Sequence, residues 1–137
     1  MIEVNGYTFT GAIKLFWPIA AKIAELSKPQ IEKKLLCGVT DYYTEYKKMP
    51  DPSKDQISHI VYDVKALEPD VIEVSGAFLA TTKGEGILKM YKDKPELQKR
   101  TKVCPNMYGI AAKKADGSPD IQKETVCTID LIIGPDK

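Results

Sequence analysis

The sequence predicts an α+β fold, with an N-terminal β-hairpin and two to three helices followed by a mainly antiparallel four-stranded sheet, the helices packed on one face. Three observations predict this fold. Apolar residues alternate from residue 71, recur at helical spacing between residues 11 and 67, and alternate again between residues 107 and 133. Because 137 residues is an ordinary length for one domain, we expect residues 1–137 to form a single α+β domain.

The stretch Val71–Tyr91 is the predicted centre of the sheet. From Ile72 to Ala80 the even positions are apolar or glycine, which is typical of a strand with one buried face. The KGEG segment at 83–86 contains two glycines that favour a chain reversal, so we expect residues 87–91 to return as a second strand. The segment does not indicate a phosphate-binding loop, because that motif leads into a helix and a strand is expected here.

The first nine residues predict a compact hairpin. Asn5-Gly6 favours a type I′ turn, which would place Val4 beside Tyr7 and Ile2 beside Phe9.

Apolar spacing predicts helices after this hairpin. The first covers residues 11–26, with a break at Pro18. The second begins at Ser27, whose side chain and Gln30 resemble a capping box, and it runs to Tyr46. The third covers Ile57–Leu67, where apolar residues are three, four and seven apart.

Two further strands are expected at residues 107–113 and 125–133. The polar interval 92–102 before them reads as a loop with one helical turn at residues 95–99. Cys104 would lie in a loop beside Pro105, and Cys104 and Cys127 would be able to face each other on neighbouring strands.

The composition limits the classes of function. With 20 basic and 19 acidic residues the net charge is +1, which gives no general attraction to nucleic acid or to an anionic membrane. No apolar run is long enough for a membrane helix, and the start lacks the features of a signal peptide. Three widely spaced cysteines, an odd number, favour reduced thiols, so we expect a cytoplasmic protein.

His59 is the single histidine and the first candidate for chemistry. On the predicted third helix it aligns with Asp55 and Asp63, and a carboxylate beside an imidazole can prepare a general base. The preferred interpretation is an exposed helix face with ordinary charge pairs. A cavity containing His59 would favour catalysis, and a fully exposed His59 would exclude it.

The sequence indicates no metal and no cofactor. One histidine and three isolated cysteines do not provide the close ligand spacing of a zinc site.

Two groups of residues are candidates for binding. The first is basic, and with Tyr91 nearby it would suit weak, sequence-nonspecific nucleic-acid binding; a solvated loop is preferred because the chain has a single arginine. The second is aromatic and suits a protein contact surface, although core packing explains it almost as well. The basic group is Lys92, Lys94, Lys99, Arg100 and Lys102, and the aromatic group is Tyr42, Tyr43 and Tyr46.

The leading functional hypothesis is a non-catalytic interaction domain that acts through a protein partner or as a homo-oligomer. The sequence leaves open whether the chain is an enzyme, and it favours a protein that is not one. The alternative is a pocket for a small hydrophobic ligand, or an acid–base enzyme of isomerase or lyase type. Its polar groups would be His59, Asp63, Tyr62 and Tyr91.

Overall fold

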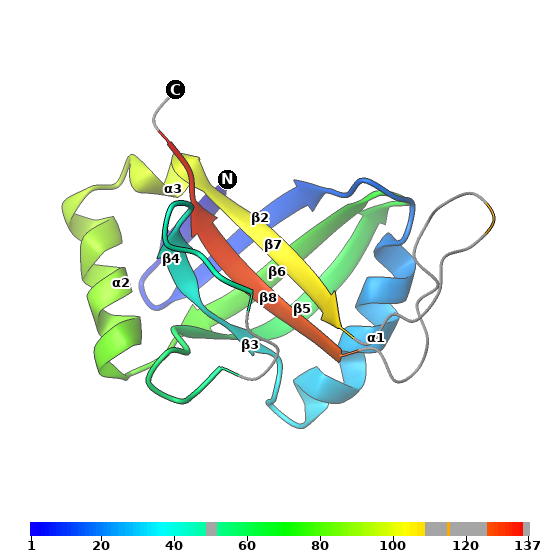
Figure 1. Ribbon diagram of the computed structural model, residues 1–137, viewed down its shortest axis with the longest axis horizontal. Coiled ribbons are helices and arrows are strands. Elements are labelled where there is room, and N and C mark those ends of the chain that lie inside the picture. Colours follow the sequence, from blue (N-terminus) through cyan, green and yellow to red (C-terminus); the bar gives the residue numbers. More distant parts are fainter. Residues whose placement is uncertain (49–51, 109–114, 116–125, 136–137) are drawn as a thin grey trace.

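The computed structural model describes residues 1–48, 52–108, 115 and 126–135, which form two curled sheets and three helices (Figure 1). The first sheet has the strand order β1 (Ile2–Asn5), β2 (Thr8–Lys14), β6 (Val71–Phe78), β5 (His59–Glu68) and β3 (Cys37–Gly38). The second has the order β4 (Thr40–Tyr42), β8 (Val126–Ile133) and β7 (Thr101–Tyr108). The helices are α1 (Ala20–Glu32), α2 (Thr82–Asp93) and α3 (Leu97–Arg100).

The predicted α+β class is confirmed, but the arrangement of its elements differs. Among the described strands, every pair is antiparallel except β4 with β8. The described part holds a five-stranded and a three-stranded sheet in place of one four-stranded sheet. Figure 1 shows β7 and β8 crossing over β2, β6 and β5, with α1 and α2 at opposite ends, so the helices do not share one sheet face.

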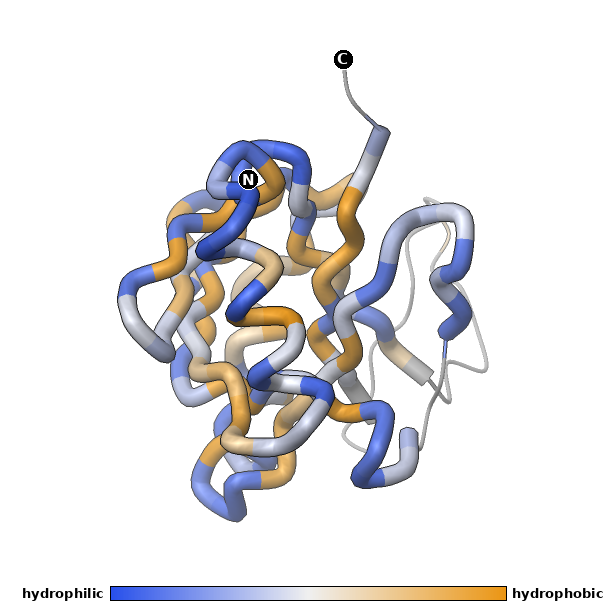
Figure 2. Tube along the Cα trace, turned by 90° about the vertical axis from the view of Figure 1, so that its left-hand side faces the viewer, coloured by the Kyte–Doolittle hydropathy of each residue, from blue (hydrophilic) through white to orange (hydrophobic). Residues whose placement is uncertain are grey.

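The core lies between the two sheets. Phe9, Ile72 and Phe78 of the first sheet are buried in one apolar cluster with Ile129 and Leu131 of the second. The rings of Phe9 and Phe78 are 5.2 Å apart. Figure 2 shows orange, hydrophobic segments alternating with blue and white ones along the chain. Burial of apolar surface by both sheets therefore holds the two layers together.

Strand β6 confirms the predicted alternation, because Ile72, Val74, Gly76 and Phe78 are all buried. The predicted return strand at residues 87–91 is wrong, since that segment belongs to α2. Thr81 caps this helix by accepting a hydrogen bond from the Gly84 N–H at 3.1 Å.

The KGEG segment thus begins a helix instead of turning a hairpin. A Cβ at Gly84 would overlap the carbonyl oxygen of Leu79, so this glycine permits the helix to pack close to the preceding chain. The helical context used above to set aside a phosphate loop is therefore present, but the Walker sequence itself is still missing.

The N-terminal hairpin is confirmed with a shifted register. Val4 pairs with Phe9, and Ile2 pairs with Gly11, so the two-residue loop is Gly6-Tyr7. Gly6 has a φ of 64°, whereas Tyr7 does not have a positive φ. This suits a type II′ turn, because the predicted type I′ turn needs a positive φ at both central residues.

The first two predicted helices are largely wrong. Helix α1 begins at Ala20, after Pro18, and continues through Ser27. Ser27 is therefore no cap: its hydroxyl donates to the Ile23 carbonyl at 2.7 Å, as serines inside helices do. The rest of the second predicted helix contains β3 and β4.

The third predicted helix is wrong because Ile57–Leu67 overlaps β5. The ladder with β6 shifts between Val61 and Asp63, which marks a β-bulge at Tyr62. Buried residues therefore occur at His59, Val61 and Val64, and this extra residue gives the strand a helix-like spacing.

The last strands agree with prediction in part. Strand β8 confirms the predicted strand from residue 126 onwards; residue 125, and residues 109–113 of the other one, lie outside the described residues. Strand β7 begins at Thr101, so Cys104 lies in a strand and not in a loop. Cys104 pairs with Asp130 and Cys127 with Met107, so the two cysteines do not face each other. Helix α3 confirms a helical turn near residues 95–99.

None of the helices in the described ranges combines the length and apolar character needed to cross a bilayer.

Candidate functional site

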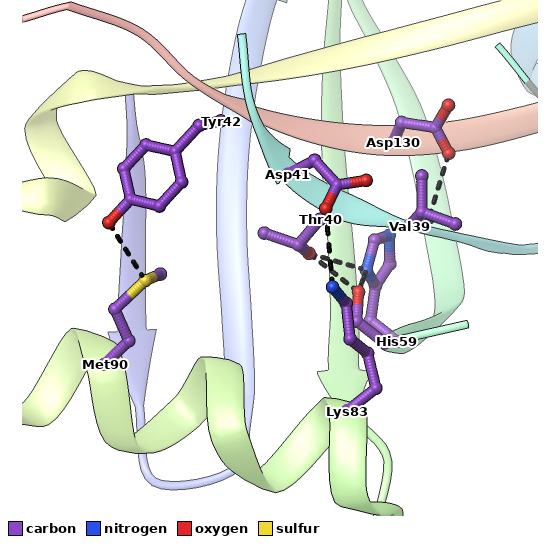
Figure 3. A network of polar contacts seen from close by, with 9 residues as sticks. Val39, Thr40, Asp41, Tyr42, His59, Lys83, Met90 and Asp130 are labelled. Carbon is purple, nitrogen blue, oxygen red and sulfur yellow. Dashed lines mark hydrogen bonds and ion pairs between the residues drawn. The ribbon is translucent and has the colours of Figure 1, made fainter. Parts of the chain in front are cut away.

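His59 lies where the two sheets meet, and its side chain is completely buried. Its Nε2 is 2.7 Å from the Ile129 carbonyl oxygen, and its Nδ1 is 2.8 Å from the Ser58 hydroxyl. Because a carbonyl only accepts, Nε2 carries the proton and Nδ1 accepts from Ser58. Thr40 extends this chain, with its hydroxyl 2.7 Å from that of Ser58. Figure 3 shows Thr40 beside the His59 ring.

The surroundings keep the imidazole neutral. Burial lowers the pKa of His59 to about 4, against a smaller opposing effect of the hydrogen bond to Ile129. The ring also contacts Phe9 edge-on, with centroids 5.3 Å apart. The predicted exposed helix face is therefore wrong, and both ring nitrogens are engaged within the protein.

The predicted partners of His59 are not assembled around it. The bulge places Asp63 away from the buried face of β5, where its carboxylate is 3.6 Å from the Lys65 ammonium. Asp55 is exposed in a turn, and Tyr62 is 51% exposed. Tyr91 is buried elsewhere, with its hydroxyl 2.8 Å from that of Thr101 and with burial raising its pKa to about 12. The predicted four-residue pocket does not form.

A second buried polar cluster surrounds Asp130, which was not predicted. Its carboxylate accepts from the Val39 N–H at 3.0 Å, the Tyr46 hydroxyl at 2.6 Å and the Asn106 amide at 2.7 Å. Burial raises the pKa of Asp130, while these bonds act in the other direction. A lone carboxylate within an apolar strand sequence was the available signal for this cluster.

Cys104 borders this cluster but is not activated. Burial is the main cause that raises the pKa of its thiol, and the charge of Asp130 adds to it. A thiolate is the nucleophilic form of cysteine, so this environment disfavours covalent catalysis.

The three tyrosines of the aromatic group have separate roles. Tyr46 is directed inwards by Asp130, and burial and this contact raise its pKa. Tyr42 and Tyr43 remain 39% and 53% exposed. Tyr46 is therefore packed inwards, while a contact surface stays a prediction for Tyr42 and Tyr43.

Tyr42 adjoins helix α2, where Figure 3 shows two contacts between β4 and the helix. The Tyr42 hydroxyl donates to the Met90 sulfur at 3.5 Å, and the Lys83 ammonium is 3.3 Å from the Asp41 carboxylate. Beside these contacts is a shallow hollow of about 290 Å³ lined by Gly86, Lys89, Met90, Asp93 and Lys94. We call Tyr42, Tyr43 and these five residues the β4–α2 surface.

The predicted basic group is distributed over three elements. Lys92 lies on α2 and Lys94 follows it, Lys99 lies on α3, and Lys102 lies on β7; all four are exposed. The Arg100 guanidinium donates twice to the Gly134 carbonyl, at 3.0 and 2.9 Å. Of this predicted basic group, only Lys94 lines the hollow.

Within the described ranges no three histidine, cysteine or carboxylate side chains are placed to hold a metal ion.

No known protein family and no curated protein matches the sequence. Among solved structures, the chain is similar to the bacteriophage T4 capsid assembly protease gp21, with a TM-score of 0.63 and 12% sequence identity. The similarity covers 98% of this chain and 92% of that chain. At this identity the likeness shows a common fold and nothing further.

Proposed function

We propose that this chain is a non-catalytic, cytoplasmic domain that binds a protein partner through the β4–α2 surface. One observation carries the proposal: the exposed Tyr42 contacts Met90, which lines a hollow on an exposed helix face, whereas the single imidazole is buried with both nitrogens engaged.

The chemistry of this surface suits a protein contact. Tyrosine offers a large contact area with few rotatable bonds, and it is enriched at protein interfaces. Met90 is half-buried beneath Tyr42 and supplies an adaptable apolar contact. Exposed Lys89 and Lys94 give the hollow a polar rim.

Photo-crosslinking tests this proposal. A photoreactive phenylalanine replaces Tyr43 in one variant and Tyr62, which is similarly exposed, in a matched control. In cells that naturally contain the protein, we expect a discrete crosslinked partner from position 43 and none from position 62. Crosslinking from position 62 alone, or from neither position, would overturn the proposal.

Peptide hydrolysis is the second candidate. Two observations favour it: the fold is similar to that of a protease, and the Ser58 hydroxyl donates to an imidazole that a carbonyl orients. Against it, Ser58 and His59 are both fully buried, so no substrate can reach them without local opening.

A fluorophosphonate probe separates the two candidates. We expect no labelling of the folded protein, because the reagent needs an accessible, activated serine. Labelling that disappears in Ser58→Ala but persists in the control Ser53→Ala would establish hydrolytic chemistry in place of the binding role.

A further inference from the structure

We propose that the hollow on α2 receives an acidic, partly apolar segment of a partner protein, whose main chain approaches closely at Gly86. The inference rests on the proposed function and specifies the chemistry of the partner.

Gly86 is the first reason. It lies in α2, and a Cβ added there would meet no atom within 4 Å. Glycine costs about 1 kcal/mol relative to alanine inside a helix, and here neither packing nor φ requires it. Gly84, two residues earlier, is different because a Cβ there would overlap Leu79. Because the fold does not explain this destabilising glycine, we infer that contact with a binding partner does.

The position of Gly86 on α2 indicates how a partner would approach. Gly86, Lys89, Met90 and Asp93 are three, four and seven residues apart, so they form one stripe on the helix. Gly86 adds no side chain to this stripe, and it lines the hollow. A partner backbone can therefore come closer to α2 at Gly86 than at any residue with a side chain.

The charge of the stripe selects an acidic occupant. Lys89 and Lys94 line the hollow against the single carboxylate of Asp93. Lys92 is exposed on the adjoining turn. An acidic segment would gain attraction at this rim, and Met90 would contact its apolar side chain.

A protein segment fits these residues better than a nucleic acid. The only arginine is bound to the Gly134 carbonyl, so it is not available for a bidentate phosphate contact. The Tyr42 hydroxyl is engaged with Met90, so it is not free to donate to a phosphate either.

A random 12-residue peptide display library, selected on the immobilised full-length chain, tests the inference. We expect enrichment of peptides rich in Asp or Glu with one or two apolar residues. For a synthetic copy of the most enriched peptide, Gly86→Ala should weaken binding at least tenfold while raising the melting temperature by about 4 °C. Lys94→Glu should weaken it similarly, and the matched charge reversal Lys28→Glu, at an exposed residue of α1, should leave it unchanged.

Three results would overturn the inference. They are the absence of enriched peptides, enrichment without an acidic bias, and equal binding by Gly86→Ala. Displacement of the peptide by a 20-nucleotide single strand that itself binds less well to Gly86→Ala would assign the hollow to nucleic acid instead. If crosslinking from position 43 persists while acidic peptides fail, the binding function stands and only this inference fails.

Discussion

At His59, burial and hydrogen bonding act on the pKa in opposite directions, and burial has the larger effect. The result is a neutral ring that serves as a structural link between β5 and the Ile129 carbonyl of β8. Asp130 is also buried, with three donors on its carboxylate. His59 and Asp130 are residue types that often take part in catalysis, but here they are buried polar groups whose hydrogen bonds are made within the core.

The buried His59 predicts a loss of stability in acid. The unfolded ring has a pKa near 6.5 and the folded ring one of about 4, so between these pH values the unfolded state binds more protons. The contribution of His59 to the free energy of unfolding should therefore be fully present above pH 6.5. As the pH falls to 4, the free energy of unfolding should decrease by about 3 kcal/mol.

Urea unfolding from pH 7.5 to 4 measures this loss, with His59→Gln as the control that lacks the titrating group. The raised pKa of Asp130 acts with the opposite sign, since its contribution is lost as the pH rises through the folded pKa. The control retains that contribution. Equal pH slopes in the two proteins, or an NMR titration of the single histidine near pH 6.5, would contradict the prediction.

At the scale of elements, β5 and α2 show why local patterns were misleading. One bulge at Tyr62 converts a period of two into the spacing 59, 61, 64, which resembles a helix. In α2 the glycines suggested a turn, but the Thr81 cap and the buried Leu88 and Tyr91 favour a helix. The alternation in β6 could be predicted because that strand has one regular buried face. Its pairing with β2 and β5 could not be predicted from the sequence.

Deletion of Tyr62 tests the bulge. Without Tyr62, Val61 and Val64 would lie on the same face with regular alternation. The protein should therefore fold, with a free energy of unfolding lower by about 1–2 kcal/mol because the bend is missing. Deletion of Ser75 in regular β6 would move Phe78 to the outer face and should prevent folding. Thermal unfolding followed by circular dichroism compares the two, and equal losses would refute the bulge as the cause.

The cap of α2 supports a separate prediction. Thr81→Ala removes the acceptor for the Gly84 N–H and should destabilise the protein by about 1 kcal/mol. Thr82→Ala is the matched control, since Thr82 is the exposed first residue of the helix and no cap. Denaturant unfolding at pH 7 measures both, and a Thr82→Ala loss as large as that of Thr81→Ala would contradict the assigned cap.

At the scale of the molecule, the described residues form one apolar core cluster, to which both sheets and the three described helices contribute. Ile23 of α1, Tyr91 of α2 and Leu97 of α3 belong to the same cluster as Phe9 and Leu131. Because each described element buries its apolar side chains against the others, no described element has a core of its own. We therefore expect the single domain to unfold as one cooperative unit.

We predict one cooperative unfolding transition. Fluorescence of Trp17, the only tryptophan, and far-ultraviolet circular dichroism should give the same midpoint in guanidinium chloride. As a control, the midpoint should not change with protein concentration if the monomer unfolds alone. Two separated transitions would refute the single-domain expectation.

The sequence by itself determined the α+β class, the N-terminal hairpin, the buried alternation of β6 and the strand β8, because these follow from local periodicity and turn residues. Tertiary structure alone decided that residues 59–68 form a bulged strand, that residues 82–93 form a helix, and that His59 is buried. Each of these depends on contacts with residues distant in the chain, such as Ile129 for His59 and Leu79 for the packing of Gly84. Local patterns carry no information about such partners, and the free energy of burying them exceeds the local preferences.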